Sequence, residues 1–140
     1  MKIKPLHPDF QLPVKATEGS GAYDLFMPEA GKYYGEDKVI VPLGFAAAVP
    51  EGHVALLVPR SGTGFKYGLE LNNTVGVIDS DFRGEWMAAM RTKTDTPLLW
   101  GKGDRLLQML IVPVASVDLQ EVDTLPETNR GKGGMGSTGK

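Results

Sequence analysis

Glycine and proline interrupt this chain so often that no long helix can form in it. The sequence holds 18 glycines and 10 prolines in 140 residues, whereas soluble proteins average about 12% of the two together. Glycine weakens a helix, and proline breaks it. No stretch shows the sustained 3.6-residue apolar period of an amphipathic helix. The pattern favours many short strands joined by turns.

Apolar stretches separated by turn residues recur about every ten residues. Pro50, Glu51 and Gly52 predict one such turn, and one or two helical turns are expected to begin near Ser61, with its hydroxyl as the cap. Strands at this spacing predict an all-β fold of the sandwich, jelly-roll or barrel type. The expected strands cover residues 39–41, 45–49, 53–58, 69–71, 74–78, 85–91 and 106–114.

The C-terminal residues differ in composition from the rest. Residues 130–140 contain five glycines and nothing to bury, so they are expected to form a mobile arm. Residues 1–129 show no repeat and no internal break. We therefore expect one β domain over residues 1–129, followed by a mobile Gly-rich arm over residues 130–140.

Composition excludes several classes of function. The 15 Lys and Arg against 17 Asp and Glu give a net charge of −2, which argues against a general nucleic-acid binder. The absence of cysteine excludes thiol catalysis, disulfides and zinc bound by sulfur. No apolar run approaches the ~18 residues of a membrane span, and the N-terminus does not resemble a signal peptide. We expect a cytoplasmic protein that binds neither nucleic acid nor membrane.

Two segments carry groups suited to an anion. Arg60, Ser61 and Gly62 follow directly on a buried strand, and a guanidinium, a hydroxyl and a close backbone can together bind phosphate. The alternative is a solvated exit from the strand. Gln108 interrupts an apolar strand; it is either a buried amide that needs partners or an outward-facing residue of a half-exposed strand.

Two aspartates are candidates for chemistry. Asp79 ends an apolar run, which predicts a partly buried carboxylate placed to activate water, although an Asp-Ser-Asp hairpin turn is the alternative. Gly76, within the preceding strand, predicts a close approach to the backbone. Asp24 can reach a hard cation, most plausibly Mg²⁺ on a phosphate, or it is a turn residue after glycine.

Five segments, in this order, resemble the motifs of the deoxyuridine triphosphate nucleotidohydrolases (dUTPases). The resemblance implies a jelly-roll-like β-fold and a homotrimer whose active sites combine residues of more than one subunit. It implies hydrolysis of dUTP to dUMP and pyrophosphate with Mg²⁺ on the triphosphate, which keeps uracil out of DNA and supplies dUMP for dTTP synthesis. The matching segments are residues 22–25, 59–62, 73–84, 103–108 and 130–139.

The resemblance also implies roles for individual residues. Asp79 is implied to orient water for in-line attack on the α-phosphorus, and Asp24 to hold Mg²⁺ through water. The implied phosphate contacts are Arg60, Ser61, Gly62, Gln108, Arg130, Ser137 and Thr138. The implied uracil and deoxyribose contacts are Asn73, Gly76, Val77, Ile78, Phe82, Met87, Met135 and Gly136.

The sequence departs from the family pattern at a few positions, and two rival functions stay open. Met135 stands where the family usually has a phenylalanine that covers uracil, and Phe82 stands where tyrosine is common. Thr63 and Gly64 replace the usual Leu-Ala. The rivals are a deoxycytidine triphosphate deaminase of the same fold and a non-enzymatic trimer that binds a partner protein.

Overall fold

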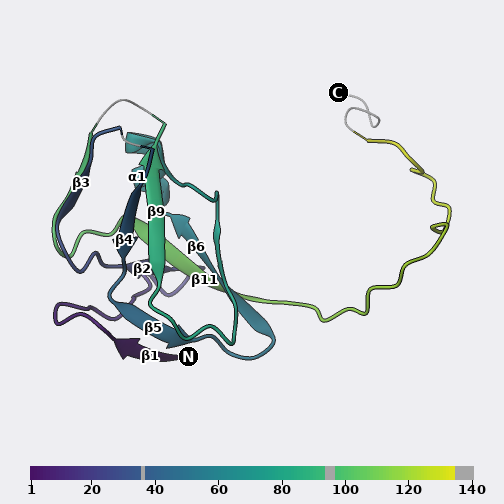
Figure 1. The fold of residues 1–140 in the computed structure, drawn as a ribbon, viewed down its shortest axis with the longest axis horizontal. Coiled ribbons are helices and arrows are strands. Elements are labelled where there is room, and N and C mark those ends of the chain that lie inside the picture. Colours follow the sequence, from purple (N-terminus) through teal and green to yellow (C-terminus); the bar gives the residue numbers. More distant parts are fainter. Residues whose placement is uncertain (36, 94–96, 135–140) are drawn as a thin grey trace.

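Eleven short strands and one short helix make up the described part of the chain, residues 1–35, 37–93 and 97–134 of a computed structural model (Figure 1). The predicted all-β fold with very little helix is confirmed. In chain order the elements are β1 Lys2–Pro5, β2 Tyr23–Leu25, β3 Gly31–Tyr33, β4 Val39–Pro42, β5 Phe45–Ala48, β6 His53–Pro59, α1 Ser61–Tyr67, β7 Leu69–Leu71, β8 Gly76–Ile78, β9 Met87–Thr92, β10 Leu98–Trp100 and β11 Leu107–Pro113.

The strands pair antiparallel in four small sheets. The largest has the order β2-β11-β6-β8, a second has the order β4-β9-β7, and β1-β5 and β10-β3 are two-stranded. The longest pairing joins β11 to β6, from Leu107 opposite Pro59 to Pro113 opposite His53. The start of β11 therefore lies at the same end of this sheet as the start of α1.

Side-chain alternation along β6 and β11 separates the core from the pocket described below. Leu57 and Met109 face each other across the two strands and are 1% and 2% exposed. Because successive side chains of a strand point to opposite faces, Gln108 lies on the face away from this core. Trp86, fully buried, packs on Phe45 with ring centroids 5.0 Å apart.

The seven predicted strands are all present, with ends shifted by a few residues. The sequence patterns missed β1, β2, β3 and β10, which span only three or four residues. The predicted turn before β6 is confirmed: the His53 N–H donates to the Pro50 carbonyl over 3.1 Å, and Gly52 has a positive φ of 71°.

The helix begins where it was expected, but its cap differs from the prediction. Arg60 is the N-cap residue and makes no side-chain cap hydrogen bond, while Ser61 is already the first helical residue. The prediction that the Ser61 hydroxyl caps the helix is therefore wrong. The helix ends at Tyr67, and the next residue, Gly68, has a φ of 61°, which glycine adopts most easily.

After β11 the chain leaves the body. The Val114 N–H donates to the Gly52 carbonyl over 2.9 Å, and residues 114–134 then extend away without a helix or strand (Figure 1). Val117, Leu119 and Leu125 are 70%, 92% and 82% exposed on this segment. The packed body thus ends near residue 113, and residues 114–129 belong spatially with the arm.

Gly31 offers a test of the packing between β3 and β10. It lies directly opposite Trp100, and a methyl group at residue 31 would overlap the indole ring. Since Trp100 is only 6% exposed, we expect Gly31→Ala to lower the free energy of unfolding by about 1–3 kcal/mol. Urea denaturation measures this change.

Gly19→Ala is the matched control, because a methyl group there meets no atom within 4 Å. Equal stability of the two variants would show that the indole moves aside at no cost.

Candidate functional site

Asp24 is the one buried charged residue in the described part of the chain, at 5% exposure. Its backbone is fixed on both edges of β2. On one side it lies opposite Gln108 of β11, and on the other its N–H donates to the Val14 carbonyl over 2.7 Å. The strand therefore sets where the carboxylate lies. The alternative that Asp24 is a turn residue is wrong.

Two arginines bind the Asp24 carboxylate. Arg60 Nε lies 2.9 Å from Oδ1, and Arg105 Nη1 lies 3.1 Å from Oδ2. Both contacts are ion pairs, and the one from Arg105 is also a charge-assisted hydrogen bond. Burying a carboxylate is costly unless it is paired and hydrogen-bonded, and here each carboxylate oxygen lies against a guanidinium group.

Arg60 is further fixed to the start of β11. Its backbone N–H donates to the Leu106 carbonyl over 2.9 Å, and its Nη1 donates to the Arg105 carbonyl over 3.0 Å. The Thr63 hydroxyl lies 2.8 Å from the Leu106 carbonyl and 2.9 Å from the Arg60 carbonyl. Thr63, one of the departures from the family pattern, thus ties the first turn of α1 to β11.

These residues surround a hollow of about 370 Å³. Gln108 is half-buried on the outward face of β11. Its amide nitrogen donates a hydrogen bond to the Pro59 carbonyl over 3.1 Å. A guanidinium, a hydroxyl and an amide around one hollow suit an anionic group such as phosphate. The hollow is lined by Ala16, Ser20, Gly21, Ala22, Asp24, Arg60, Ser61, Gln108 and Leu110.

Asp79 lies far from this hollow within one chain. β8 pairs with β6 so that Ile78 faces Ala55, which places Asp79 beside Val54. Arg60 follows six residues later, so at ~3.3 Å per residue the two sites are roughly 20 Å apart. Asp79 is also exposed, so the prediction that it is partly buried is wrong for the single chain.

The residues implied for uracil and sugar lie around β8, away from the hollow. Asn73 donates from its Nδ2 to the Val75 carbonyl over 3.0 Å, which closes the turn before the strand. The predicted close approach at Gly76 is confirmed, because a Cβ there would lie 3.0 Å from the Leu57 Cβ. The neighbouring Val77 is 57% exposed, and Ile78 is partly buried against the core.

Two further residues implied for the base and sugar are exposed. Phe82 is 43% exposed, and its ring lies so close to Gly84 that a Cβ there would come within 2.6 Å of it. Met87, at 45% exposure, lies on β9 opposite Pro42 of β4. Both surfaces are available to a ligand or to another chain.

Of the C-terminal residues implied for phosphate binding, Arg130 is the one that the structure describes. Arg130 is exposed on the extended arm, and its Nε donates to the Gly133 carbonyl over 2.9 Å. Met135, Gly136, Ser137 and Thr138 lie outside the described residues.

Arg105 is a site residue that the sequence analysis missed. It lies in the segment 103–108 but was given no role of its own. The signal that could have found it is electrostatic, since a buried aspartate needs cationic partners. Arg105 and Asp24 are 81 positions apart in the sequence, so their contact becomes visible only when β2 is seen to pair with β11.

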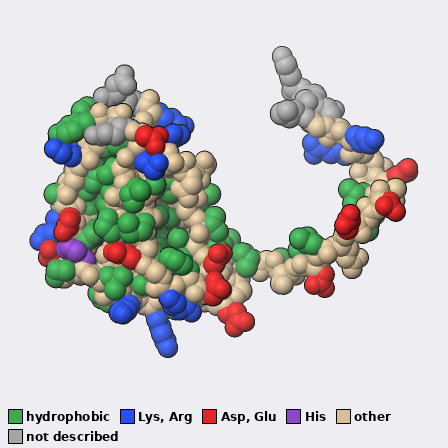
Figure 2. Space-filling view, in the orientation of Figure 1, with side chains coloured by type: hydrophobic (Ala, Val, Ile, Leu, Met, Phe, Trp, Pro, Cys, Tyr) green, Lys and Arg blue, Asp and Glu red, His purple; other side chains and the backbone are tan. Residues whose placement is uncertain are grey.

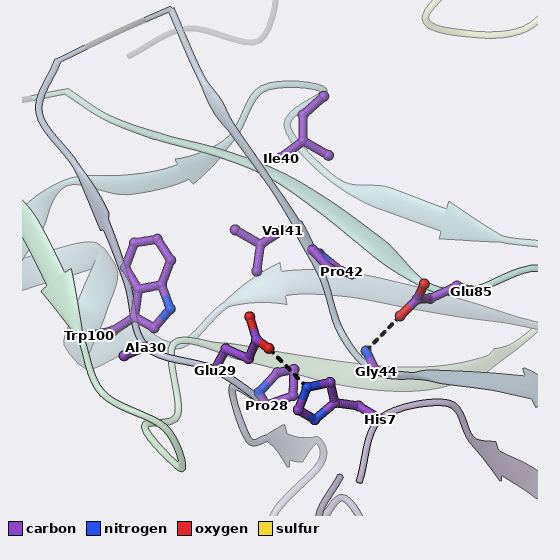
Figure 3. A pocket seen from close by; sticks show the side chains of 10 residues that line it. All are labelled: His7, Pro28, Glu29, Ala30, Ile40, Val41, Pro42, Gly44, Glu85 and Trp100. Atoms are coloured by element: carbon purple, nitrogen blue, oxygen red, sulfur yellow. Dashed lines mark hydrogen bonds and ion pairs between the residues drawn. The ribbon is translucent and has the colours of Figure 1, made fainter. Parts of the chain in front are cut away.

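A second hollow contains none of the predicted site residues. It has apolar walls that include Val41, Pro42 and Trp100, and a volume of about 210 Å³ (Figure 3). His7 Nε2 lies 3.1 Å from Glu29 Oε1 at its rim. His7 Nδ1 accepts the Asp9 N–H, so Nε2 carries the hydrogen. The ring is therefore fixed by local bonds rather than held ready for a ligand.

Among the described residues, no three His, Cys, Asp or Glu side chains converge as metal ligands. No helix in this part of the chain is long and apolar enough to cross a membrane. Fold and site together define a small antiparallel β protein. Its hollow, whose lining includes a guanidinium and an amide suited to an anion, lies between β2, β11 and the start of α1.

Comparison with known proteins gives this class a family. The family model for dUTPase matches residues 9–139. The deoxyuridine 5'-triphosphate nucleotidohydrolase of Dictyoglomus turgidum is 39% identical over 98% of this chain and 96% of its own length, and that of Corynebacterium diphtheriae is 41% identical over 98% and 91%. The chain belongs to the dUTPase family, whose curated members are dUTP diphosphatases.

Solved structures agree on the fold. A mutant dUTPase of Staphylococcus bacteriophage 80alpha with dUpNHpp aligns with a TM-score of 0.86 at 23% identity, over 99% of this chain and 98% of that one. A mutant dUTPase from phage phi11 of S. aureus, described with a structural Mg(II) ion, aligns with a TM-score of 0.79 at 22% identity, over 88% and 96%.

The pairing of Asp24 predicts a difference between two aspartates. Asp24→Asn removes the negative charge that pairs with two arginines, so it should lower the free energy of unfolding by roughly 2–4 kcal/mol. This loss is somewhat smaller than for a fully buried ion pair, because both guanidinium groups are partly exposed. Asp79→Asn, at an exposed position, should hardly change it. Chemical denaturation of both variants checks this, and an equal loss in both would contradict the assigned pairing.

Proposed function

We propose that this protein hydrolyses dUTP to dUMP and pyrophosphate in active sites that are shared between the subunits of a homotrimer. Family membership supports the substrate and the reaction. The observation that carries the shared site is the separation of Asp79 from Arg60 along β6. A residue that steers water onto the α-phosphorus must lie beside the groups that bind the phosphates.

One chain cannot bring these groups together. Asp79 and Arg60 lie roughly 20 Å apart along the sheet. In a nucleotide only a single sugar separates the base from the α-phosphate, so the groups that bind one nucleotide must lie much closer together than this. Neither segment can slide, because β6 is paired on both sides, with β11 and with β8. The water-steering aspartate of one chain therefore serves the hollow of another.

Two surfaces support assembly. Ile40 on β4 and Met87 on β9 are 58% and 45% exposed, and Figure 2 shows hydrophobic side chains gathered over these strands. The arm carries exposed apolar residues away from its own body (Figures 1 and 2). Exposed apolar patches of this kind mark contact surfaces. The number of three subunits comes from the resemblance to the family.

Each group has a physical role in the proposed reaction. Asp79 accepts a proton from the water that attacks the α-phosphorus in line. Arg60 and Ser61 bind phosphate oxygens from the hollow, with Gln108 beside them. Arg130 of an arm adds a second guanidinium where charge gathers on the leaving group. The resemblance assigns Ser137 and Thr138 to the same phosphates and Met135 and Gly136 to the cover over uracil.

The edge of the large sheet suits the base. β8 is the outermost strand of β2-β11-β6-β8, so one row of its backbone N–H and C=O groups is not used for pairing within this sheet. Uracil presents carbonyl acceptors beside an imide N–H donor, which a row of backbone N–H and C=O groups can complement. Cytosine has an acceptor and a donor in the reversed places, so donors would face donors and acceptors would face acceptors. Phe82 follows β8 in a turn in which its N–H donates to the Asp79 carbonyl over 3.3 Å, and its exposed ring can pack on the deoxyribose and leave no room for a 2′-hydroxyl.

Mg²⁺ fits the residues of the hollow as an ion held mainly by the substrate. Mg²⁺ keeps several waters and is usually bound through one or two carboxylates together with phosphate oxygens. Asp24 is the carboxylate in the hollow, and since its two oxygens already bind arginines, it would meet the ion through water. The bound ion would neutralise part of the triphosphate charge.

A nucleotide panel tests the reaction. We expect pyrophosphate release from dUTP in the presence of Mg²⁺, with much slower release from dTTP, dCTP and UTP. Asp79→Asn should reduce kcat by at least about 10²-fold, because the general base is lost. Release from all nucleotides alike, or deamination of dCTP, would contradict the proposal.

Mixing two inactive variants tests the sharing of sites. Asp79→Asn and Arg60→Gln chains should each be nearly inactive alone. When they are unfolded together and refolded, about one site in four should combine an intact Asp79 with an intact Arg60 from different chains, and activity should return. Refolding each variant separately before mixing is the control. If co-refolding restores nothing, the two residues act within one chain.

A further inference from the structure

We propose that Arg105 is a positioning residue that keeps the phosphate hollow positively charged by sharing Asp24 with Arg60. The inference rests on the proposed function, because it names how the same site attracts its anionic substrate. Arg105 does not line the hollow. Arg105 acts on Arg60 indirectly, through the Asp24 carboxylate that both arginines contact.

The charge balance follows from the contacts. Arg60 Nε and Arg105 Nη1 bind different oxygens of the same carboxylate, at 2.9 and 3.1 Å. A guanidinium stays charged at any ordinary pH, so the three groups together carry one net positive charge. Without Arg105, Asp24 would neutralise Arg60 completely, and the hollow would offer a triphosphate no net charge from this cluster.

The contacts also orient Arg60. Its Nε faces Asp24, and its Nη1 donates to the Arg105 carbonyl over 3.0 Å, which leaves Nη2 as the remaining nitrogen for a ligand. Arg105 is itself steadied, since its guanidinium carbon lies 5.9 Å from the centre of the Phe26 ring. A preorganised donor binds an anion without first paying the entropy of ordering its side chain.

A merely structural role for Arg105 would give a different outcome from charge sharing. Loss of charge acts equally on bound substrate and transition state, so it should raise KM and leave kcat nearly unchanged. It should also reduce the dependence of KM on salt, because one positive charge near the anion is lost. A fold defect would instead lower the melting temperature and the fraction of active enzyme, with the salt dependence unaltered.

The experiment compares Arg105→Gln with Arg105→Lys in the full-length protein. We expect Arg105→Gln to raise KM for dUTP about tenfold, change kcat less than about threefold, and flatten the plot of log KM against log salt concentration. Arg105→Lys, which keeps the charge, should stay within about threefold of the parent protein in KM. A KM change of equal size in both variants, or an unchanged salt slope in Arg105→Gln, would overturn the inference.

Arg91→Gln is the matched control, because it changes the net charge of the chain equally but lies outside the hollow. Arg91 pairs with Glu70 across β7 and β9 at 2.8 Å, and hydrogen bonds from Lys93 and Arg91 hold the pKa of Glu70 below its usual range. KM and its salt dependence should match those of the parent protein. A shift equal to that of Arg105→Gln would assign the effect to overall charge and overturn the inference.

Binding of inorganic pyrophosphate without metal, measured by calorimetry, gives a second readout that does not need catalysis. Arg105→Gln should bind it about tenfold more weakly. The double variant Asp24→Asn with Arg105→Gln leaves Arg60 as the only charged member of the cluster and should bind pyrophosphate more tightly than Arg105→Gln alone; no recovery of affinity would overturn the inference. If the parent protein binds pyrophosphate but hydrolyses no dUTP, the proposed function fails and the charge-sharing inference is still tested.

Discussion

A single buried carboxylate between two guanidinium groups organises the hollow at the junction of β2, β11 and α1. Asp24 cannot be buried without both partners, because an unpaired charge in the interior is strongly destabilising. Meeting that requirement fixes β2 against β11, the start of β11 against the end of β6, and the first turn of α1 against both. The same bonds present Arg60 to the hollow in one orientation. Stability and the proposed anion binding therefore depend on the same contacts.

The antiparallel register determines what one chain can and cannot do. Arg60 follows one end of β6, and β8 pairs with β6 near the other end. The length of β6 therefore holds Asp79 apart from the hollow. A loop could move to close such a gap, but a central strand paired on both edges cannot. Assembly is therefore part of the proposed chemistry. The extended arm leaves the body beside Gly52, at the end of β6 that lies away from Arg60. It therefore starts far from the hollow of its own chain.

Much of the fold could be predicted from turn chemistry and apolar runs, and the failures have physical reasons. Strands of six or seven residues, such as β6 and β11, appear as long apolar runs, whereas β2 is defined by its pairing with the distant β11. The segment proposed to bind phosphate could be suggested from the sequence because Arg60, Ser61 and Gly62 are adjacent. The link from Asp24 to Arg105 could not, since it depends on a pairing between distant segments. Asp79 was expected to be partly buried because it follows an apolar run, but that run forms an edge strand and the carboxylate is exposed.

The central claim, that Asp79 of one chain serves the phosphate hollow of another, is tested most directly by a distance measured between chains. Because the sequence has no cysteine, single cysteines introduced by Ala16→Cys at the rim of the hollow and by Asp81→Cys beside Asp79 can carry spin labels without background. Oligomers refolded from the two singly labelled chains should show a label separation clearly shorter than the roughly 20 Å that β6 imposes within one chain. If the separation between chains is instead longer than the separation in a doubly labelled single chain diluted with unlabelled protein, the shared site does not exist.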